Sequence, residues 1–250
     1  VLVGATAIAQ LGNEAQKQVL LPKIVAGELL TALALDEHTS HNPSKIATTA
    51  TKVDGGYSLN GSKTFVLDGH IANMLIVVAR TSGETDSEQG ISLFLVDANA
   101  EGLNVARTIM VDSRNSSNIQ FNNVVVAEDA LLGEKDQGFN GLDSVLDIAR
   151  IGIAAEMLGS MQAVFESILE FLKQREQFGV LIGSFQGLQH RAAEMYSEIE
   201  LCKSAVRAAL AGLDEPDTNQ AEIAVLASMT KAKLSEVFFL VSNEGIQMHG

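Results

Sequence analysis

The spacing of apolar residues changes from a strand period to a helix period, and this change constrains the fold more than any other feature. From residue 31 to about 132, apolar segments such as NMLIVVAR and ISLFLVDA are separated by Gly, Asn, Asp and Ser, which is typical of antiparallel strands. From about residue 138, apolar residues recur every three or four positions, which indicates long packed helices. The sequence therefore predicts an α+β multidomain fold: an antiparallel β-sandwich or β-barrel followed by an up-and-down helical bundle.

Three apolar seams with short connections predict three antiparallel helices of an incomplete bundle. They cover residues 151–172, 188–213 and 223–241. Before the strands, the chain has a helical pattern that we expect Pro22 to break. The predicted domains are the end of an N-terminal helical domain at 1–30, a middle β domain at 31–135 and the incomplete bundle at 136–250.

Asn60-Gly61 lies within the β region, in the segment YSLNGSKTFVLDG. This dipeptide is the strongest short signal for a two-residue hairpin turn, because both positions of that turn need a positive φ. We therefore expect the chain to reverse at Asn60-Gly61.

Charge and cysteine content exclude several classes of function. Lys plus Arg total 17 against 31 Asp plus Glu, a net charge of -14, which repels nucleic acid and anionic membrane surfaces. Cys202 is the single cysteine, so a disulfide framework and a cysteine zinc site are excluded and a reducing compartment is expected. No apolar run reaches the roughly 18 residues that a membrane span needs.

The segment EHTSH brings His38 and His41 close together without a third metal ligand, so we interpret it as a polar loop and expect no metal. The sequence contains none of the common dinucleotide-binding, P-loop, nucleophile-elbow or zinc-protease motifs. Because the chain starts without Met and stops at GIQMHG, we expect a piece of a longer protein.

The connection between the first two predicted bundle helices is unusual. The segment REQFGVLIGSFQ contains Arg175, Gln177, Phe178, Phe185 and Gln186, whereas a plain connection needs only Gly and a few polar residues. Arg175 could simply interact with the C-terminal end of the first helix, where a cation is favourable. An anion-binding role is the alternative.

The order of helix, β domain and bundle, with REQFG inside the bundle, resembles the acyl-CoA dehydrogenase family over nearly the whole chain. The segments that carry the resemblance are LGNEAQKQVLLPKIVAGELLTALALDE, YSLNGSKTFVLDG, GFNGLDSVLDIARIGIAAEMLGSMQAVFE with its continuation through REQFG, and EGIQMHG. The resemblance implies an FAD-dependent α,β-dehydrogenation of an acyl-CoA thioester, with electrons passed to an electron-transfer flavoprotein. It also implies a homotetramer or a two-component heterotetramer, in the bacterial cytoplasm or the mitochondrial matrix.

The same resemblance implies two groups of cofactor-binding residues. Those for the subunit's own flavin are Leu35, Asp36, Phe65, Val66 and Leu67. Those that would contact the flavin of a neighbouring subunit are Arg175, Gln177, Phe178, Ile182, Phe185, Gln186, Gln247 and Met248. Arg175 would bind the pyrophosphate, while Asp147 and Arg150 match a pair near the CoA cleft, although both could be ordinary helix-start charges.

Several positions depart from the family pattern. The catalytic glutamate is expected beyond Gly250, and Ala149 occupies the position at which some branches carry it. Asp36 replaces a threonine near the flavin's pyrimidine edge, and Leu67 replaces the threonine expected beside N5. Two interpretations follow: a working flavoenzyme that tolerates altered contacts, or a catalytically silent subunit that completes a partner's site. A free-standing acyl-CoA-binding module is a more remote alternative.

Overall fold

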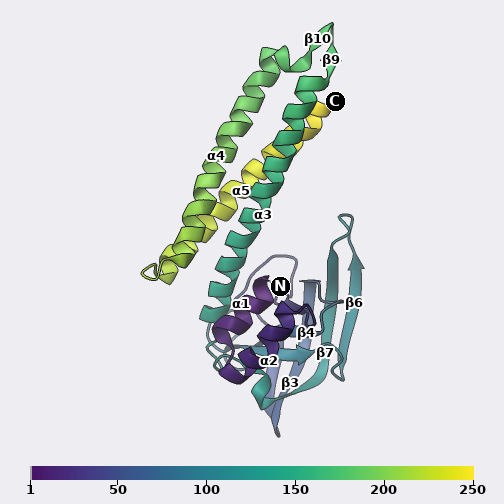
Figure 1. Ribbon diagram of the computed structural model, residues 1–250. Helices are drawn as coiled ribbons and strands as arrows, with labels where there is room; N and C mark the ends of the chain where they lie inside the picture. Colours follow the sequence, from purple (N-terminus) through teal and green to yellow (C-terminus); the bar gives the residue numbers. More distant parts are fainter. Residues whose placement is uncertain (1) are drawn as a thin grey trace. The chain divides into compact units, whose positions relative to one another are not determined.

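The computed structural model describes residues 2–250, which form two compact units, one up to Val145 and one from Leu146 (Figure 1). The first unit contains α1 (Leu2–Leu11), α2 (Glu14–Val25), β1 (Thr31–Ala34), β2 (Thr49–Val53), β3 (Gly56–Leu67), β4 (Met74–Arg80), β5 (Ile91–Asp97), β6 (Leu103–Ile109), β7 (Asn115–Ala127), the 3-10 turn η1 (Glu128–Ala130) and β8 (Leu131–Leu132). The second contains most of α3 (Gly138–Gln174), β9 (Glu176–Gln177), β10 (Val180–Leu181), η2 (Ile182–Ser184), α4 (Gln186–Asp214) and α5 (Gln220–His249). The predicted order of a β domain followed by three long helices is confirmed.

The strands of the first unit form one mixed sheet in the order β6-β7-β3-β2-β4-β5-β8, with β1 paired to β4. Most neighbours are antiparallel, but β1 runs parallel to β4, from Thr31 opposite Met74 to Ala34 opposite Val77. This pairing differs from the all-antiparallel arrangement that we expected. It is possible because β2 and β3 lie between β1 and β4 in the sequence and return the chain to the same end of the sheet.

Helix α1 packs closely on the start of β1. A Cβ atom at Gly4 would come within 1.8 Å of Thr31 Oγ1, so only glycine permits this approach. Strands β4 and β5 are buried over nearly their whole length, with Leu75, Val77 and Phe94 in the core. Because β1 pairs with the buried strand β4, the position of β4 determines where the polar segment that follows Ala34 begins.

The predicted turn at Asn60-Gly61 is wrong. The hairpin between β2 and β3 reverses instead at Asp54-Gly55, with Val53 paired to Gly56 and Gly55 at φ 77°. Gly61 lies inside β3, where the register against β7 shifts and its own φ is 147°. A bulge needs the same conformational freedom as a turn, so the dipeptide marks an irregularity in a strand that continues beyond it.

Pro22 lies inside α2 and does not break it. Asn13 caps the helix in a reciprocal arrangement with Gln16, and the carbonyl of Pro22 accepts the N–H of Ala26 at 2.9 Å. Proline here removes one hydrogen bond in the last turn, and the helix ends three residues later, so the cost remains small.

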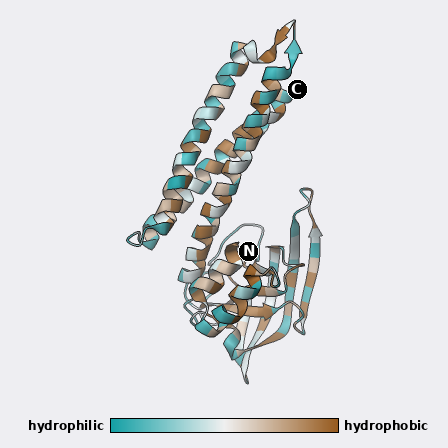
Figure 2. Ribbon diagram, viewed as in Figure 1, coloured by the Kyte–Doolittle hydropathy of each residue, from teal (hydrophilic) through white to brown (hydrophobic). Residues whose placement is uncertain are grey.

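The three long helices bury the predicted seams against one another. Met161 and Ile168 of α3, Ile199 and Cys202 of α4, and Leu234 of α5 belong to one apolar cluster. Figure 2 shows apolar and polar residues interspersed along each helix, as expected for helices that bury one face. Among residues 2–250, α3 is the one helix long and apolar enough to cross a membrane by length and composition, and its buried seam packs on α4 and α5.

Candidate functional site

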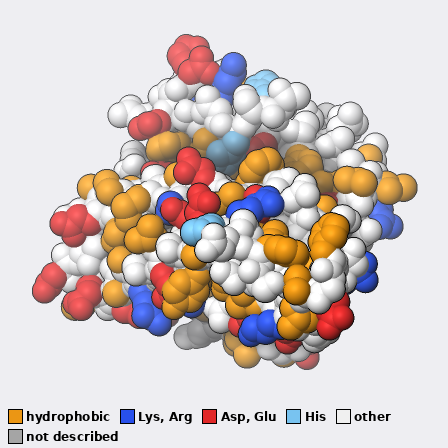
Figure 3. Space-filling model, turned by 90° about the horizontal axis from the view of Figure 1, so that it is seen from above, with side chains coloured by type: hydrophobic (Ala, Val, Ile, Leu, Met, Phe, Trp, Pro, Cys, Tyr) orange, Lys and Arg blue, Asp and Glu red, His pale blue; other side chains and the backbone are white. Residues whose placement is uncertain are grey.

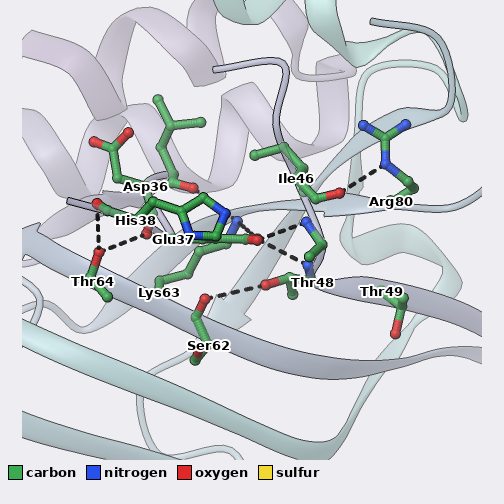
Figure 4. A network of polar contacts seen from close by, with 12 residues as sticks. Asp36, Glu37, His38, Ile46, Thr48, Thr49, Ser62, Lys63, Thr64 and Arg80 are labelled. Carbon is green, nitrogen blue, oxygen red and sulfur yellow. Dashed lines mark hydrogen bonds and ion pairs between the residues drawn. The ribbon is translucent and has the colours of Figure 1, made fainter. Parts of the chain in front are cut away.

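The polar segment that follows β1 and the central part of β3 enclose a cavity of about 780 Å³ in the first unit. Its lining side chains are Asp36, Glu37, His38, Thr39, His41, Thr64, Phe65, Thr108 and Asn118. Figure 4 shows how Asp36, Glu37 and His38 meet Lys63 and Thr64 of β3. The cavity therefore combines carboxylates, imidazoles, hydroxyls, one side-chain amide and one phenyl ring.

Glu37 and Lys63 form a buried ion pair beneath this cavity, with side chains 5% and 0% exposed. Lys63 Nζ donates to Glu37 Oε1 at 2.7 Å and to the carbonyl oxygen of Leu35 at 2.9 Å. Glu37 also accepts the backbone N–H groups of Ala47 at 2.7 Å and Thr48 at 2.9 Å. The pair therefore joins the end of β1, the start of β2 and the middle of β3.

Burial changes the proton affinity of both members. Removal from water lowers the pKa of Lys63 to about 8, although the charge of Glu37 opposes this change. Burial alone would raise the pKa of Glu37. The charge and hydrogen bond of Lys63, together with hydrogen bonds from Thr48 and Ala47, lower this pKa overall. Both groups are thus charged at neutral pH, and each depends on the other.

Asp36 makes a second side-chain contact at the cavity. His41 Nδ1 lies 2.9 Å from Asp36 Oδ1, with the histidine side chain 50% exposed and the aspartate 29%. The Asp36 carbonyl oxygen accepts the N–H of Thr64 at 2.7 Å. The backbone of Asp36 is thereby held on β3 while its carboxylate remains beside His41.

Phe65 presents its ring to the cavity from a strained backbone position. Its φ is 53°, and its N–H donates to Asn118 Oδ1 at 3.1 Å where the register between β3 and β7 shifts. Phe65 is 54% exposed and Leu67 is 56% exposed, whereas Val66 between them is buried. A bulky residue with positive φ is uncommon and tends to be retained where its side chain must face a functional surface.

The structure thus separates the residues expected at the subunit's own flavin. Asp36 and Phe65 line the cavity, while the side chains of Leu35 and Val66 belong to the core and Leu67 lies exposed at the end of β3. The donors and the flat apolar ring suit a planar heterocycle with carbonyl groups, such as the isoalloxazine ring of a flavin. The residues present therefore fit FAD, with a carboxylate in place of a neutral hydroxyl as the main difference.

The unusual connection in the second unit is a short exposed hairpin of β9 and β10. Arg175 directly follows α3, and its backbone is fixed by bonds to Phe171 and Ile182. Phe178 and Gly179 form the tip with φ of 57° and 81°, and Phe178 is 94% exposed. The phenyl rings of Phe178 and Phe185 pack edge to face, with their centroids 6.2 Å apart.

The side chains expected to reach a neighbouring flavin mostly lie at the surface. Arg175, Gln177, Phe178, Phe185, Gln186 and Gln247 are exposed, and Ile182 is half-buried. Met248 is 4% exposed and packs in the apolar cluster of the three helices, so its side chain does not reach this surface. On the last turn of a helix, adjacent positions face different directions, which is why Gln247 and Met248 differ.

Asp147 is a buried carboxylate on α3. Its Oδ1 accepts Arg150 Nη1 at 2.6 Å, and its Oδ2 accepts Nε2 of Gln220, the first residue of α5, at 3.0 Å. Asp147 therefore holds Arg150 in place and fixes the start of α5 against α3. The expected pair is brought together, with Gln220 as a third member that the sequence did not indicate.

Sequence reasoning missed Glu37, Lys63 and His41. The available signal for the buried pair was Lys63, which lies in the middle of a predicted strand, together with Glu37, which follows another strand. His41 was interpreted as part of a polar loop, and its pairing with Asp36 depends on how that loop folds back. Over residues 2–250, no group of three or more His, Cys, Asp or Glu side chains could hold a metal ion.

Comparison with known proteins places these features in a family. The model of the acyl-CoA dehydrogenase middle domain matches residues 32–124, and that of the acyl-CoA dehydrogenase C-terminal domain matches residues 136–250. An acyl-CoA dehydrogenase of Bacillus subtilis (strain 168) is 34% identical over 99% of the chain. The chain spans 65% of that relative's length.

Solved structures give the same result. Butyryl-CoA dehydrogenase from Megasphaera elsdenii superposes with a TM-score of 0.92 at 32% identity, over 100% of this chain and 65% of its own. A structure described as the FAD complex of PigA superposes with a TM-score of 0.92 at 27% identity, also over 100% of this chain and 65% of its own.

Proposed function

Because the chain belongs to the acyl-CoA dehydrogenase family, whose members depend on FAD, we propose that the whole protein dehydrogenates an acyl-CoA thioester between its α and β carbons. The observation that carries the proposal is the exposed β9–β10 hairpin, which presents Arg175, Gln177 and Phe178 together. An arginine beside exposed aromatic and amide groups suits a ligand with both phosphate and planar rings.

Each unit contributes different contacts in this proposal. The bound FAD would supply the acceptor for the hydride that leaves the β carbon of the substrate. Phe65 provides a flat apolar face, and Thr64 helps to fix the backbone beneath it. Asp147 holds Arg150 by a hydrogen bond of 2.6 Å, and this cation, placed beside a bound thioester, would stabilise the negative charge that develops as the α proton leaves. A carboxylate outside residues 1–250 takes that proton.

The hairpin also supports an oligomer. Phe178 is 94% exposed, and a phenyl group held in water at a hairpin tip is typical of a surface that a partner covers. We propose a tetramer in which Arg175 binds the pyrophosphate of the neighbouring subunit's FAD, with electrons leaving to an electron-transfer flavoprotein.

The test is an Arg175→Ala variant of the full-length protein. The loss of a charge-assisted pair with phosphate costs roughly 1.5 to 3 kcal/mol, so FAD affinity is expected to fall at least tenfold. Arg207→Ala is the matched control, because Arg207 is an exposed arginine on α4 of the same unit. Equal FAD affinity in wild type and Arg175→Ala would reject the pyrophosphate contact.

A second candidate function has its own supporting observation. Asp36 lies at the cavity of the subunit's own flavin, in place of the family's threonine, whereas the hairpin residues are intact. This combination suits a silent subunit that completes a partner's site. The visible spectrum of the purified full-length protein separates the two, since a working enzyme carries its own yellow flavin and a silent subunit acquires flavin only with its partner.

A further inference from the structure

The cavity after β1 places a basic side chain beside each of its two consecutive acidic residues, although the whole chain carries a net charge of -14. Two consecutive acidic residues line it, and each has its own basic partner. Glu37 pairs with Lys63 of β3 at 2.7 Å, and Asp36 pairs with His41 at 2.9 Å. Only the first pair is buried, so the second is the one that a ligand in the cavity touches.

The position of His41 distinguishes it from the other histidine of the same segment. Both histidines line the cavity, but His38 is held through its carbonyl oxygen, which accepts from Thr64 Oγ1 at 3.4 Å. The ring of His41 is the group that bonds the Asp36 carboxylate. The other charged groups near Asp36 are Glu37, next to it in the chain, and Lys63, whose charge interacts with it.

We propose that His41 is a positioning residue that fixes the Asp36 carboxylate by a hydrogen bond and weakens its negative field, so that the cavity can accept a flavin ring that becomes anionic on reduction. The inference rests on the proposed function, because it takes FAD as the occupant of this cavity. It deepens that function by explaining how a carboxylate can stand where the family pattern has a neutral hydroxyl.

The physical argument is electrostatic. A free carboxylate beside the ring repels the negative charge that reduction adds, and this repulsion disfavours the reduced state. The His41 ring donates a hydrogen bond to the carboxylate, with Nδ1 2.9 Å from Asp36 Oδ1, and this bond weakens the carboxylate's negative field at the flavin ring. His41 therefore acts mainly on the reduced flavin, and only weakly on the oxidised one.

The experiment measures flavin affinity and midpoint potential in the full-length protein and four variants. His41→Ala is expected to weaken binding of reduced FAD about tenfold more than that of oxidised FAD, which lowers a two-electron potential by about 30 mV. His41→Lys, which places another hydrogen-bond donor beside Asp36, is expected to retain most of the wild-type potential. Asp36→Asn combined with His41→Ala is expected to restore the wild-type midpoint potential as well, because the negative charge at position 36 is removed.

Lys52→Ala is the matched control, since it also removes the basic partner of a carboxylate in the first unit. Lys52 pairs with Glu128 at 2.6 Å on the surface, away from the cavity lining. The flavin midpoint potential of the Lys52→Ala variant should equal that of the wild type. A His41→Ala potential equal to wild type, or no recovery in the Asp36→Asn double variant, would overturn the inference alone. A wild-type protein that binds no flavin would overturn the proposed function with it.

Discussion

Replacing Lys63 by methionine is expected to destabilise the first unit strongly, although methionine fits the volume and is more apolar. The reason is that Glu37, the partner of Lys63, stays buried after the substitution. Glu37 is 5% exposed and would lose the cation that stabilises its charge. Removing one member of a buried pair typically costs 3–5 kcal/mol. Glu37 keeps the N–H groups of Ala47 and Thr48, so we expect the lower end, about 3 kcal/mol.

The assay is urea unfolding at pH 7 followed by circular dichroism, because the chain contains no tryptophan to report by fluorescence. Lys63→Met combined with Glu37→Gln should recover part of the loss, since the amide is neutral and keeps one acceptor oxygen. Lys52→Met is the control, and it should change the unfolding free energy far less, because water screens its exposed pair. If Lys63→Met costs no more than Lys52→Met, the argument from burial is refuted.

The pKa of Lys63 adds a pH dependence to the same experiment. Because burial lowers that pKa to about 8, the unfolded chain binds more protons than the folded chain between pH 8 and the ordinary lysine pKa of about 10.4. The unfolding free energy of the wild type should therefore rise through this window, by up to about 3 kcal/mol relative to Lys63→Met. A constant difference between the two proteins from pH 7 to 10 contradicts the lowered pKa.

Three further results are expected. Arg80→Lys should expose the loop between β4 and β5 to limited proteolysis, because lysine cannot replace the fork of donors that binds its carbonyls. Gly90→Ala should lower the unfolding free energy by about 2 kcal/mol or more in thermal unfolding, since φ is +85° and a Cβ would lie 2.0 Å from the Ser82 carbonyl oxygen. Asp147→Ala should cost about 1 to 3 kcal/mol in urea unfolding, because the hydrogen bonds of this carboxylate to Gln220 and Arg150 are lost, and a change below 0.5 kcal/mol would contradict the link between α3 and α5.

The helical half was predictable because its signal is repeated. Each seam places an apolar residue on one face at every turn, from Ile151 to Leu172 in α3, and one misplaced residue does not alter the period. The β domain was predictable as a class but not in its pairing. Both Asp54-Gly55 and Asn60-Gly61 satisfy the local rule for a hairpin, and the choice between them depends on the partner strand β7, which lies about 60 residues away.

The candidate site was predictable in part for a similar reason. Asp36 and Phe65 line one cavity, but the side chains of Leu35 and Val66 lie in the core because strand neighbours face opposite sides. The pairs of Glu37 with Lys63 and of Asp36 with His41 arise from chain segments that meet only in the fold. Local sequence rules contain no information on such contacts.

Arg80 gives the loop between β4 and β5 an unusual kind of constraint. Its guanidinium donates only to backbone carbonyls, those of Ser44, Ile46, Ser82, Thr85, Ser87 and Gln89. Every residue type has a carbonyl, so Arg80 holds the loop without regard to its side chains. Apart from Gly90, whose positive φ requires glycine, Arg80 therefore constrains the length of the loop rather than its side chains, because an inserted or deleted residue would move the carbonyls out of reach.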